Sequence, residues 1–316
     1  MIDVCSPVVV GQRQLWFIAR DAQGYEVDSL EVIGPNAGIS GLQSGVELGD
    51  RELKQMYHAQ RSFEDTDAIG VDGSIPGHGH VTTRQFTIKI TVRATDNYSW
   101  ETVERRLWEL TSPQRGHGKT GTFFIRYKER DGQAREIEVR RTGTPEPDND
   151  TLAGNRGWET WTFDVTAYDP WWYGEDEVAR FVNTERASSA VLTISNPGDQ
   201  EGDLVWTFPP SAVYQSWTIP DGLGVYPDGH EKAGQRIMMP LPTIAAGETA
   251  QADTRPYRLP FRILGKPMSF GLMRQTRFTH PLPPRTFNAE LPVEMVTSDD
   301  GSVEVRLRPR YERPYA

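Results

Sequence analysis

The fold is decided by residues 84–94, RQFTIKITVRA, and by the segments that follow: DNYSWETVERRLWELTSP (96–113), GTFFIRYKERDG (121–132), QAREIEVRRTG (133–143) and GWETWTFDVTAYDPWWYGE (157–175). In the first segment, apolar residues from Phe86 to Val92 alternate with polar ones. A period of two is typical of a strand with one buried face. Residues 84–94 therefore predict a β-strand.

The next segment changes period, because apolar residues from Trp100 to Leu110 recur at helical spacing. Ser99 precedes them and is a residue type that accepts hydrogen bonds from the first free N–H groups of a helix. Pro113 marks the end, since proline is disfavoured inside a helix. The pattern predicts one helix near residues 99–112.

Three further strands are expected after the helix. Apolar residues alternate again in 123–127 and 137–139, and Arg130-Asp131-Gly132 supplies a hairpin turn between them. The last strand carries Trp161, Phe163 and Val165 on one face. It stops at Asp169-Pro170, because proline cannot donate to a sheet ladder.

This order of elements, with AYDPWWYG (167–174) directly after the last strand, resembles the distal tail protein family of long-tailed bacteriophages, often called minor tail proteins. The resemblance implies a structural protein of the virion, located at the phage tail tip and made in the host cytoplasm. It implies a homo-oligomeric, hexameric ring that connects the tail tube to the tail-tip hub. The implied partners are further copies of the chain, the tail tube protein, the tape-measure protein and the tail-tip hub protein.

Length and composition favour two mostly β domains. A chain of 316 residues exceeds a comfortable single core, and 29 glycines and 23 prolines spread between short apolar runs are typical of short strands joined by turns. Residues 1–175 are expected to form an α+β domain with a sandwich or barrel-like sheet and one helix, ring-forming by resemblance. Residues 176–316 hold eight short apolar runs, which predict an all-β jelly-roll sandwich, galectin-like by resemblance.

Residues 34–83 differ from the rest of the first domain. Two stretches of this segment, 34–45 and 68–80, are rich in glycine and poor in large apolar residues, so they are expected to form extended loops or a long hairpin instead of core. Between these stretches, Arg51–Arg61 has Leu53, Met56 and Tyr57 at helical spacing but fits a strand equally well. In the resembled family, corresponding insertions help neighbouring subunits to clasp each other, which implies the same role here.

Charge and composition exclude several classes of function. The net charge of −10 argues against a nucleic-acid-binding surface, although DNA passing through a channel remains compatible with it. No apolar stretch approaches the ~20 residues that cross a bilayer, and the first ten residues lack the pattern of a secretion signal, so we expect no membrane insertion. The single cysteine, Cys5, excludes an intrachain disulfide and is expected to be a buried apolar residue.

Apparent chemical motifs do not hold together. The sequence GHGKT at 116–120 lacks the earlier glycine of a phosphate-binding loop and follows a helix instead of preceding one. The histidines of 77–80 have no acidic or cysteine ligand at metal-binding spacing. The remaining histidines and the paired carboxylates are scattered among turns: His58, His117, His230, His280, Asp148/Asp150, Glu175/Asp176/Glu177 and Asp299/Asp300. We therefore predict no catalytic, cofactor-binding or metal-binding residue.

Aromatic residues give the candidate contact sites. Trp171, Trp172 and Tyr173 are adjacent, so on extended backbone the two tryptophans point to opposite sides and one must leave the core face. They pack at a domain junction or anchor a neighbouring subunit, since tryptophan is enriched at interfaces. In the second domain Trp217 and Tyr226 are candidate contacts for a host glycan, although an apolar run around Trp217 favours core.

Three functions were weighed: a structural assembly protein, a carbohydrate-binding module that contributes to host-surface attachment, and a glycan-cleaving enzyme. The enzyme is disfavoured for want of a site. The sequence favours the structural tail-tip protein, with the carbohydrate-binding module as the alternative.

Overall fold

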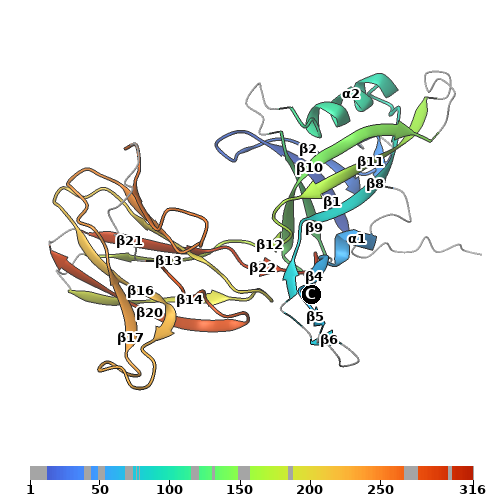
Figure 1. Ribbon diagram of the computed structural model, residues 1–316. Helices are drawn as coiled ribbons and strands as arrows, with labels where there is room; N and C mark the ends of the chain where they lie inside the picture. Colours follow the sequence, from blue (N-terminus) through green and yellow to red (C-terminus); the bar gives the residue numbers. More distant parts are fainter. Residues whose placement is uncertain are drawn as a thin grey trace, which may run out of the picture. The chain divides into compact units, whose positions relative to one another are not determined.

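The computed structural model describes residues 13–38, 44–48, 54–67, 74–75, 77, 79–114, 121–129, 132–148, 157–183, 188–266, 277–297 and 301–315 (Figure 1). The chain divides into two compact units, unit 1 (Met1–Tyr173 and Glu312–Ala316) and unit 2 (Gly174–Tyr311). The predicted second domain covers all of 176–316, whereas Glu312–Ala316 belong to unit 1. No helix in the described ranges is long and apolar enough to span a membrane.

Unit 1 is built on one curled antiparallel sheet, which confirms the mostly β class. Its strands are β1 (Gln14–Arg20), β2 (Glu26–Ile33), β3 (Val46–Leu48), β8 (Arg84–Arg93), β9 (Phe123–Lys128), β10 (Ala134–Pro147), β11 (Trp158–Ala167) and β12 (Trp172–Tyr173). The main path runs β2-β1-β9-β10-β11-β8-β3, and β12 pairs with β10. The fold therefore places the predicted strand β8 beside the last strand of the stretch, β11.

The long strand β10 belongs to both halves of the sheet and allows it to curl. Its first half, Ala134–Val139, pairs with β9, and its second half, from Arg140 onward, pairs with β11. At the open edge, the Ser44 hydroxyl next to β3 donates to the Glu31 carbonyl of β2 at 2.6 Å. The sheet is therefore a nearly closed barrel.

The core of unit 1 follows from the predicted alternation. In β8 the side chains of Phe86, Ile88, Ile90 and Val92 are all buried, while the residues between them are partly or fully exposed. The pairing of β8 with β11 is continuous, from Arg84 opposite Ala167 to Arg93 opposite Trp158. The apolar residues that recur with a period of two in the sequence thus all point into the barrel.

Helix α2 (Trp100–Leu110) forms where it was predicted and lies against the sheet (Figure 1). Its buried residues are Val103, Leu107 and Leu110, which share one helical face. The prediction for Ser99 was wrong in detail: its side chain makes no capping hydrogen bond, and its Oγ lies 3.2 Å from Thr102 Oγ1 instead. The apolar face thus positions α2 without help from the cap.

Of the alternatives left open for segment 34–83, a long hairpin and a short helix form among the residues that the structure describes. After β3 come α1 (Lys54–Tyr57), β4 (Arg61–Phe63), β5 (Thr66–Asp67), β6 (Ser74–Ile75) and β7 (Gly79–Val81). Strand β4 pairs with β7 and β5 with β6, so these four strands form a long hairpin, here called the arm. The expectation of loops was wrong for Val46, which is fully buried because β3 pairs with β8. Of the two alternatives left open for Arg51–Arg61, the helix forms around Met56, which is fully buried where α1 packs against β8.

Unit 2 is a sandwich of two antiparallel sheets. One has the order β13-β21-β15-β18-β19 and the other β14-β20-β16-β17. The strands are β13 (Glu177–Val182), β14 (Ser189–Asn196), β15 (Leu204–Phe208), β16 (Ser216–Val225), β17 (Arg236–Pro240), β18 (Ala250–Asp253), β19 (Phe261–Ile263), β20 (Thr286–Thr297) and β21 (Ser302–Leu307). The short strand β22 (Arg310–Tyr311) follows β21 in the chain and belongs to neither of these two sheets. Apolar side chains of both sheets meet in one core, with Trp206 and Phe208 from the first and Trp217 and Leu291 from the second.

Candidate functional site

The three adjacent aromatic residues 171–173 point to different sides of the backbone, as their adjacency predicts. Trp172 is 0% exposed, and its indole Nε1 donates to the Met56 carbonyl at 3.4 Å. Trp171 and Tyr173 are half-buried, and the Tyr173 hydroxyl donates to Asp169 Oδ2 at 2.5 Å. Trp172 is therefore a core residue of its own chain. Only its two neighbours keep surface that another subunit can contact.

Arg84 lies in the core beside Trp172 and was missed by the sequence analysis. The side chain is 0% exposed, Nη1 donates to the Met56 carbonyl at 2.6 Å and Nη2 to the Glu312 carbonyl at 2.8 Å. Burial lowers the pKa of the Arg84 guanidinium to about 10. A signal was present in the sequence, because Arg84 has the same parity as Phe86 and so points inward.

The end of the chain is held on unit 1 by several contacts of different kinds. Arg61 pairs with Glu312 at 3.2 Å, and Arg135 Nη1 donates to the Arg313 carbonyl at 2.9 Å. The Tyr315 ring lies 5.5 Å from the ring of Tyr57, edge to face. With the Arg84 bond, these contacts make residues 312–315 a structural part of unit 1.

Among the exposed apolar side chains of unit 1, which also include Tyr98 and Tyr168, two groups lie on a hairpin and at a sheet edge. Phe63 on the arm is 60% exposed, and its ring lies so close to Gly79 that a Cβ added there would approach Phe63 Cε1 to 2.7 Å. Tyr25 and Val27 are exposed at the start of β2, an edge strand of the main sheet. Exposed apolar side chains on a hairpin and on a sheet edge are typical of surfaces that meet another chain.

The outer face of β8 and β11 carries a polar groove of about 390 Å³. Its lining is rich in threonine, and Thr87 Oγ1 donates to Asp164 Oδ1 at 2.6 Å. Asp164 is the one carboxylate in this lining, so the groove lacks the second acid that glycoside hydrolysis requires.

Of the two glycan candidates in unit 2, Trp217 cannot reach a ligand. It is 1% exposed, and its Nε1 donates to Gln215 Oε1 at 3.0 Å, so it is a sandwich core residue. Tyr226 is half-buried and its ring stacks on His230, with 4.4 Å between centroids and 12° between planes. One face of Tyr226 is therefore already covered by its own chain.

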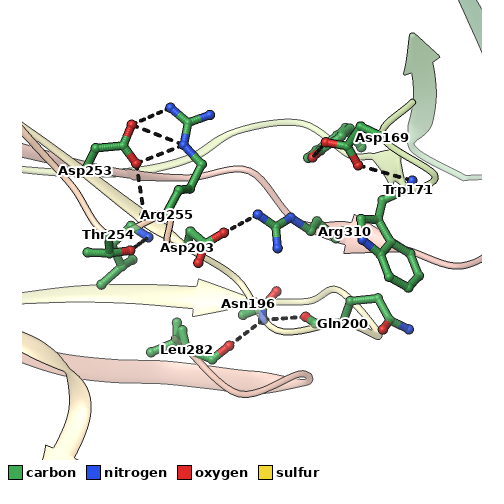
Figure 2. Close-up of polar contacts among 12 residues, drawn as sticks. Asp169, Trp171, Asn196, Gln200, Asp203, Asp253, Thr254, Arg255, Leu282 and Arg310 are labelled. Carbon is green, nitrogen blue, oxygen red and sulfur yellow. Dashed lines mark hydrogen bonds and ion pairs between the residues drawn. The ribbon is translucent and has the colours of Figure 1, made fainter. Parts of the chain in front are cut away.

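Hydrogen bonds and an ion pair hold the loops at one end of unit 2 (Figure 2). Buried Asn196 donates from Nδ2 to the carbonyls of Gln200 at 3.0 Å and Leu282 at 3.1 Å. Arg310 pairs with Asp203 in the same region. These contacts satisfy polar groups that would otherwise be costly to bury, and they hold the loops in place.

One histidine of unit 2 meets a carboxylate. His280 Nδ1 lies 2.7 Å from Asp221 Oδ2, and buried Asp221 also accepts from the Thr279 N–H at 3.0 Å. The Thr279 hydroxyl lies 3.0 Å from the same Nδ1, so it faces the atom that Asp221 uses. A catalytic triad needs the nucleophile on the other ring nitrogen, so this cluster fixes the segment 279–280 instead.

Some candidates lie outside the described residues, namely Cys5, His78, His117, Asp150, Asp299 and Asp300. Within the described part of the chain, no group of three or more histidine, cysteine, aspartate or glutamate side chains is placed to hold a metal ion.

Comparison with solved structures finds a similar fold in a chain of a phage baseplate. No protein-family model and no curated protein matches the chain. A chain of the phage P2 baseplate, in its activated conformation with Ca, has a TM-score of 0.51 at 9% identity, covering 94% of this chain and 98% of that one. The chain has the fold of a phage baseplate protein.

Two further solved structures are similar. The phage p2 baseplate in its activated conformation with Sr gives a TM-score of 0.49 at 10% identity, covering 93% of this chain and 97% of that one. The SPP1 Dit protein, described as a paradigm of the hub adsorption apparatus in phages that infect Gram-positive bacteria, gives 0.49 at 13% identity, covering 83% and 97%.

Proposed function

We propose that this chain is a structural, non-enzymatic protein of a phage tail tip, where six copies form a closed ring that connects the tail tube to the tail-tip hub. The observation that carries the proposal is the fold likeness to a phage P2 baseplate chain, which extends over 94% of the sequence and so includes both units. A likeness confined to the sandwich would have favoured a free binding module instead.

The surface of unit 1 supports the assembly role. The arm presents Phe63, and the edge strand β2 presents Tyr25 and Val27. A closed ring needs two different patches on each copy, because its contacts are heterologous. We assign the arm as one patch and the β2 edge as the other, with Trp171 and Tyr173 as further contact candidates.

The proposed partners follow from a place between tube and hub. They are further copies of the chain, the tail tube protein, the tape-measure protein and the tail-tip hub protein. A net charge of −10 suits a channel through which DNA passes without being gripped. Chemical cross-linking of purified virions, followed by mass spectrometry, tests these contacts directly.

The mass of the purified protein tests the ring. Six chains of 35.7 kDa give about 214 kDa, and negative-stain images should show an annulus with a central hole. Each subunit contact is expected to bury on the order of 2,000 Å². A single species of 35.7 kDa at micromolar concentration, and in disassembled virions, would contradict the ring.

A pair of matched variants separates assembly from folding. Phe63→Ser removes an exposed aromatic from the arm, whereas Phe287→Ser removes one of similar exposure from unit 2. Neither is expected to change the melting temperature, because both rings are largely in solvent. We expect Phe63→Ser to shift the population toward monomer and Phe287→Ser to leave it unchanged. Equal effects would remove the arm from the interface.

A further inference from the structure

A cavity of about 440 Å³ lies in unit 2 beside the loop that joins β18 to β19. It is lined by three arginines, Arg255, Arg258 and Arg277, together with Asp253, Tyr257 and Phe278. Phe278 is buried and supplies an apolar floor, whereas Tyr257 is 64% exposed and offers its ring to solvent. The volume is in the range of pockets that bind small ligands.

The loop that builds the cavity is fixed before any ligand arrives. Arg258 N–H donates to the Arg255 carbonyl at 3.1 Å, which closes a turn with Pro256 at its second position. Proline is favoured there because its ring presets the backbone angle. At the start of the loop, the Thr254 N–H donates to the Leu204 carbonyl at 3.0 Å and Thr254 Oγ1 accepts from the Leu204 N–H at 2.8 Å. Because the loop is already held in one conformation, ligand binding would cost little further conformational entropy.

The guanidinium of Arg255 is also held in one orientation. Its Nε lies 2.8 Å from Asp253 Oδ1 and its Nη2 2.5 Å from Oδ2, so the carboxylate grips one edge of the planar group (Figure 2). Asp253 is buried, whereas the Arg255 side chain keeps 31% exposure. The Nη1 edge is directed away from these two bonds and is free to donate to another oxyanion.

The cavity is electropositive on a chain that is acidic overall. Asp253 compensates one of the three arginines, and the exposed side chains of Arg258 and Arg277 form no ion pair with any residue that the structure describes. The Arg258 guanidinium carbon lies 5.7 Å from the centroid of the Tyr257 ring. An anion at Arg258 would thus sit next to an aromatic ring with one face available.

We propose that this cavity binds an acidic saccharide, a sugar that carries a phosphate or carboxylate group. The arginines would bind the anionic group through paired N–H donors, which match the geometry of both phosphate and carboxylate. Tyr257 would stack on the C–H face of the sugar ring. The inference goes beyond the structural role, and it places a ligand on unit 2 at residues other than Trp217 and Tyr226.

Titration of the full-length chain with small probes tests the site. Calorimetry or ligand-detected NMR at low salt would compare glucose 6-phosphate, glucuronate, glucose and inorganic phosphate. We expect the two acidic sugars to bind, the neutral sugar to bind at least about tenfold more weakly, and the affinity to fall between 20 and 300 mM NaCl, roughly, because salt screens exposed charges. The tighter of the two acidic sugars identifies the preferred anion.

Variants locate the binding in the cavity. Arg258→Gln and Arg277→Gln should each weaken the acidic sugars about tenfold or more. Tyr257→Ala should weaken the acidic sugars but leave inorganic phosphate unchanged, since phosphate has no ring to stack. Arg180→Gln removes an equal charge from an exposed position of β13 and should change nothing. Because Tyr257, Arg258 and Arg277 are exposed, none of these substitutions is expected to change the thermal transition. An unchanged transition shows that each variant is folded.

Three results would overturn the proposal. They are no binding of either acidic sugar, binding that survives both arginine substitutions, and binding of inorganic phosphate as tight as that of glucose 6-phosphate, which would reveal an adventitious ion only. None of these outcomes depends on ring formation, so the assembly role and the saccharide site fail or stand separately.

Discussion

Arg84→Ala is expected to destabilise unit 1 more than any exposed arginine substitution does. The change removes two hydrogen bonds from a charged donor, to the Met56 carbonyl at 2.6 Å and the Glu312 carbonyl at 2.8 Å. Bonds to charged groups contribute about 1.5–3 kcal/mol each. It also leaves a cavity and a Glu312 carbonyl without this donor.

An opposing term reduces the loss. Burial lowers the pKa of the Arg84 guanidinium to about 10, so holding the charge inside the fold costs about 3 kcal/mol, and that cost disappears in the variant. Removing one partner from a buried charged contact nevertheless costs about 3–5 kcal/mol in comparable cases. We expect a loss of about 3 kcal/mol for Arg84→Ala, and at least about 1 kcal/mol less for Arg84→Met, which refills the space.

Urea unfolding followed by hydrogen exchange of peptides from β8 reports on unit 1 alone. Arg105→Ala, at an exposed position of α2, serves as the control and should stay within about 0.5 kcal/mol of the parent. A chain that ends at Tyr311 lacks the Glu312 acceptor, so Arg84→Ala should cost less in that background. A loss below about 1 kcal/mol, or equal losses in both backgrounds, would refute the reasoning.

Three further outcomes are expected. Leu107→Ala, which empties the buried face of α2, should lower the free energy of unfolding by about 2–5 kcal/mol in urea titrations. Trp217→Ala should cost about 3–5 kcal/mol and leave the affinity for acidic sugars unchanged in the folded fraction. Tyr127→Phe removes a buried hydroxyl without a partner among the described residues, so stability at pH 7 should stay equal or rise by up to about 1 kcal/mol. Burial raises the pKa of the Tyr127 phenol, so the parent should lose stability as pH rises above about 10 and the variant should lose less.

The elements that sequence predicted best are those whose periodicity is complete within one segment. Strand β8 and helix α2 each carry an uninterrupted apolar face, and each face is buried as expected. Local periodicity sufficed to predict these two elements, because an apolar face is buried against any apolar surface and the residues of that surface need not be known. The predicted cap at Ser99 was wrong, because packing of the apolar face is enough to fix α2. The Ser99 hydroxyl bonds the Thr102 hydroxyl instead.

What sequence could not predict depends on partners far away in the chain. Arg84 looked like a polar residue at the start of a strand, yet its two acceptors are 28 and 228 residues away. The return of residues 312–315 to unit 1 has no local signal at all, because an ion pair, a ring contact and carbonyl acceptors hold it. Val46 was missed because it follows a glycine-rich stretch, where apolar residues are too sparse to show a period. The spacing of Leu53, Met56 and Tyr57 left helix and strand open, and only the packing of α1 against β8 decides for a helix.

The same distinction explains why the apolar run around Trp217 favoured a core role for this residue, whereas no pattern in the sequence drew attention to Tyr257. Trp217 lies in an apolar run, so the strand that contains it buries the ring. Tyr257 follows Pro256 in a turn between two short strands, where no sheet face can cover it, and arginines flank it in space. The rings of Trp206, Phe208 and Trp217 are buried in the sandwich core, whereas the ring of Tyr257, beside a proline-fixed turn, stays exposed next to the arginines of the cavity. The glycan alternative is therefore carried by the loop at 253–260, and Trp217 is left to hold the two sheets together.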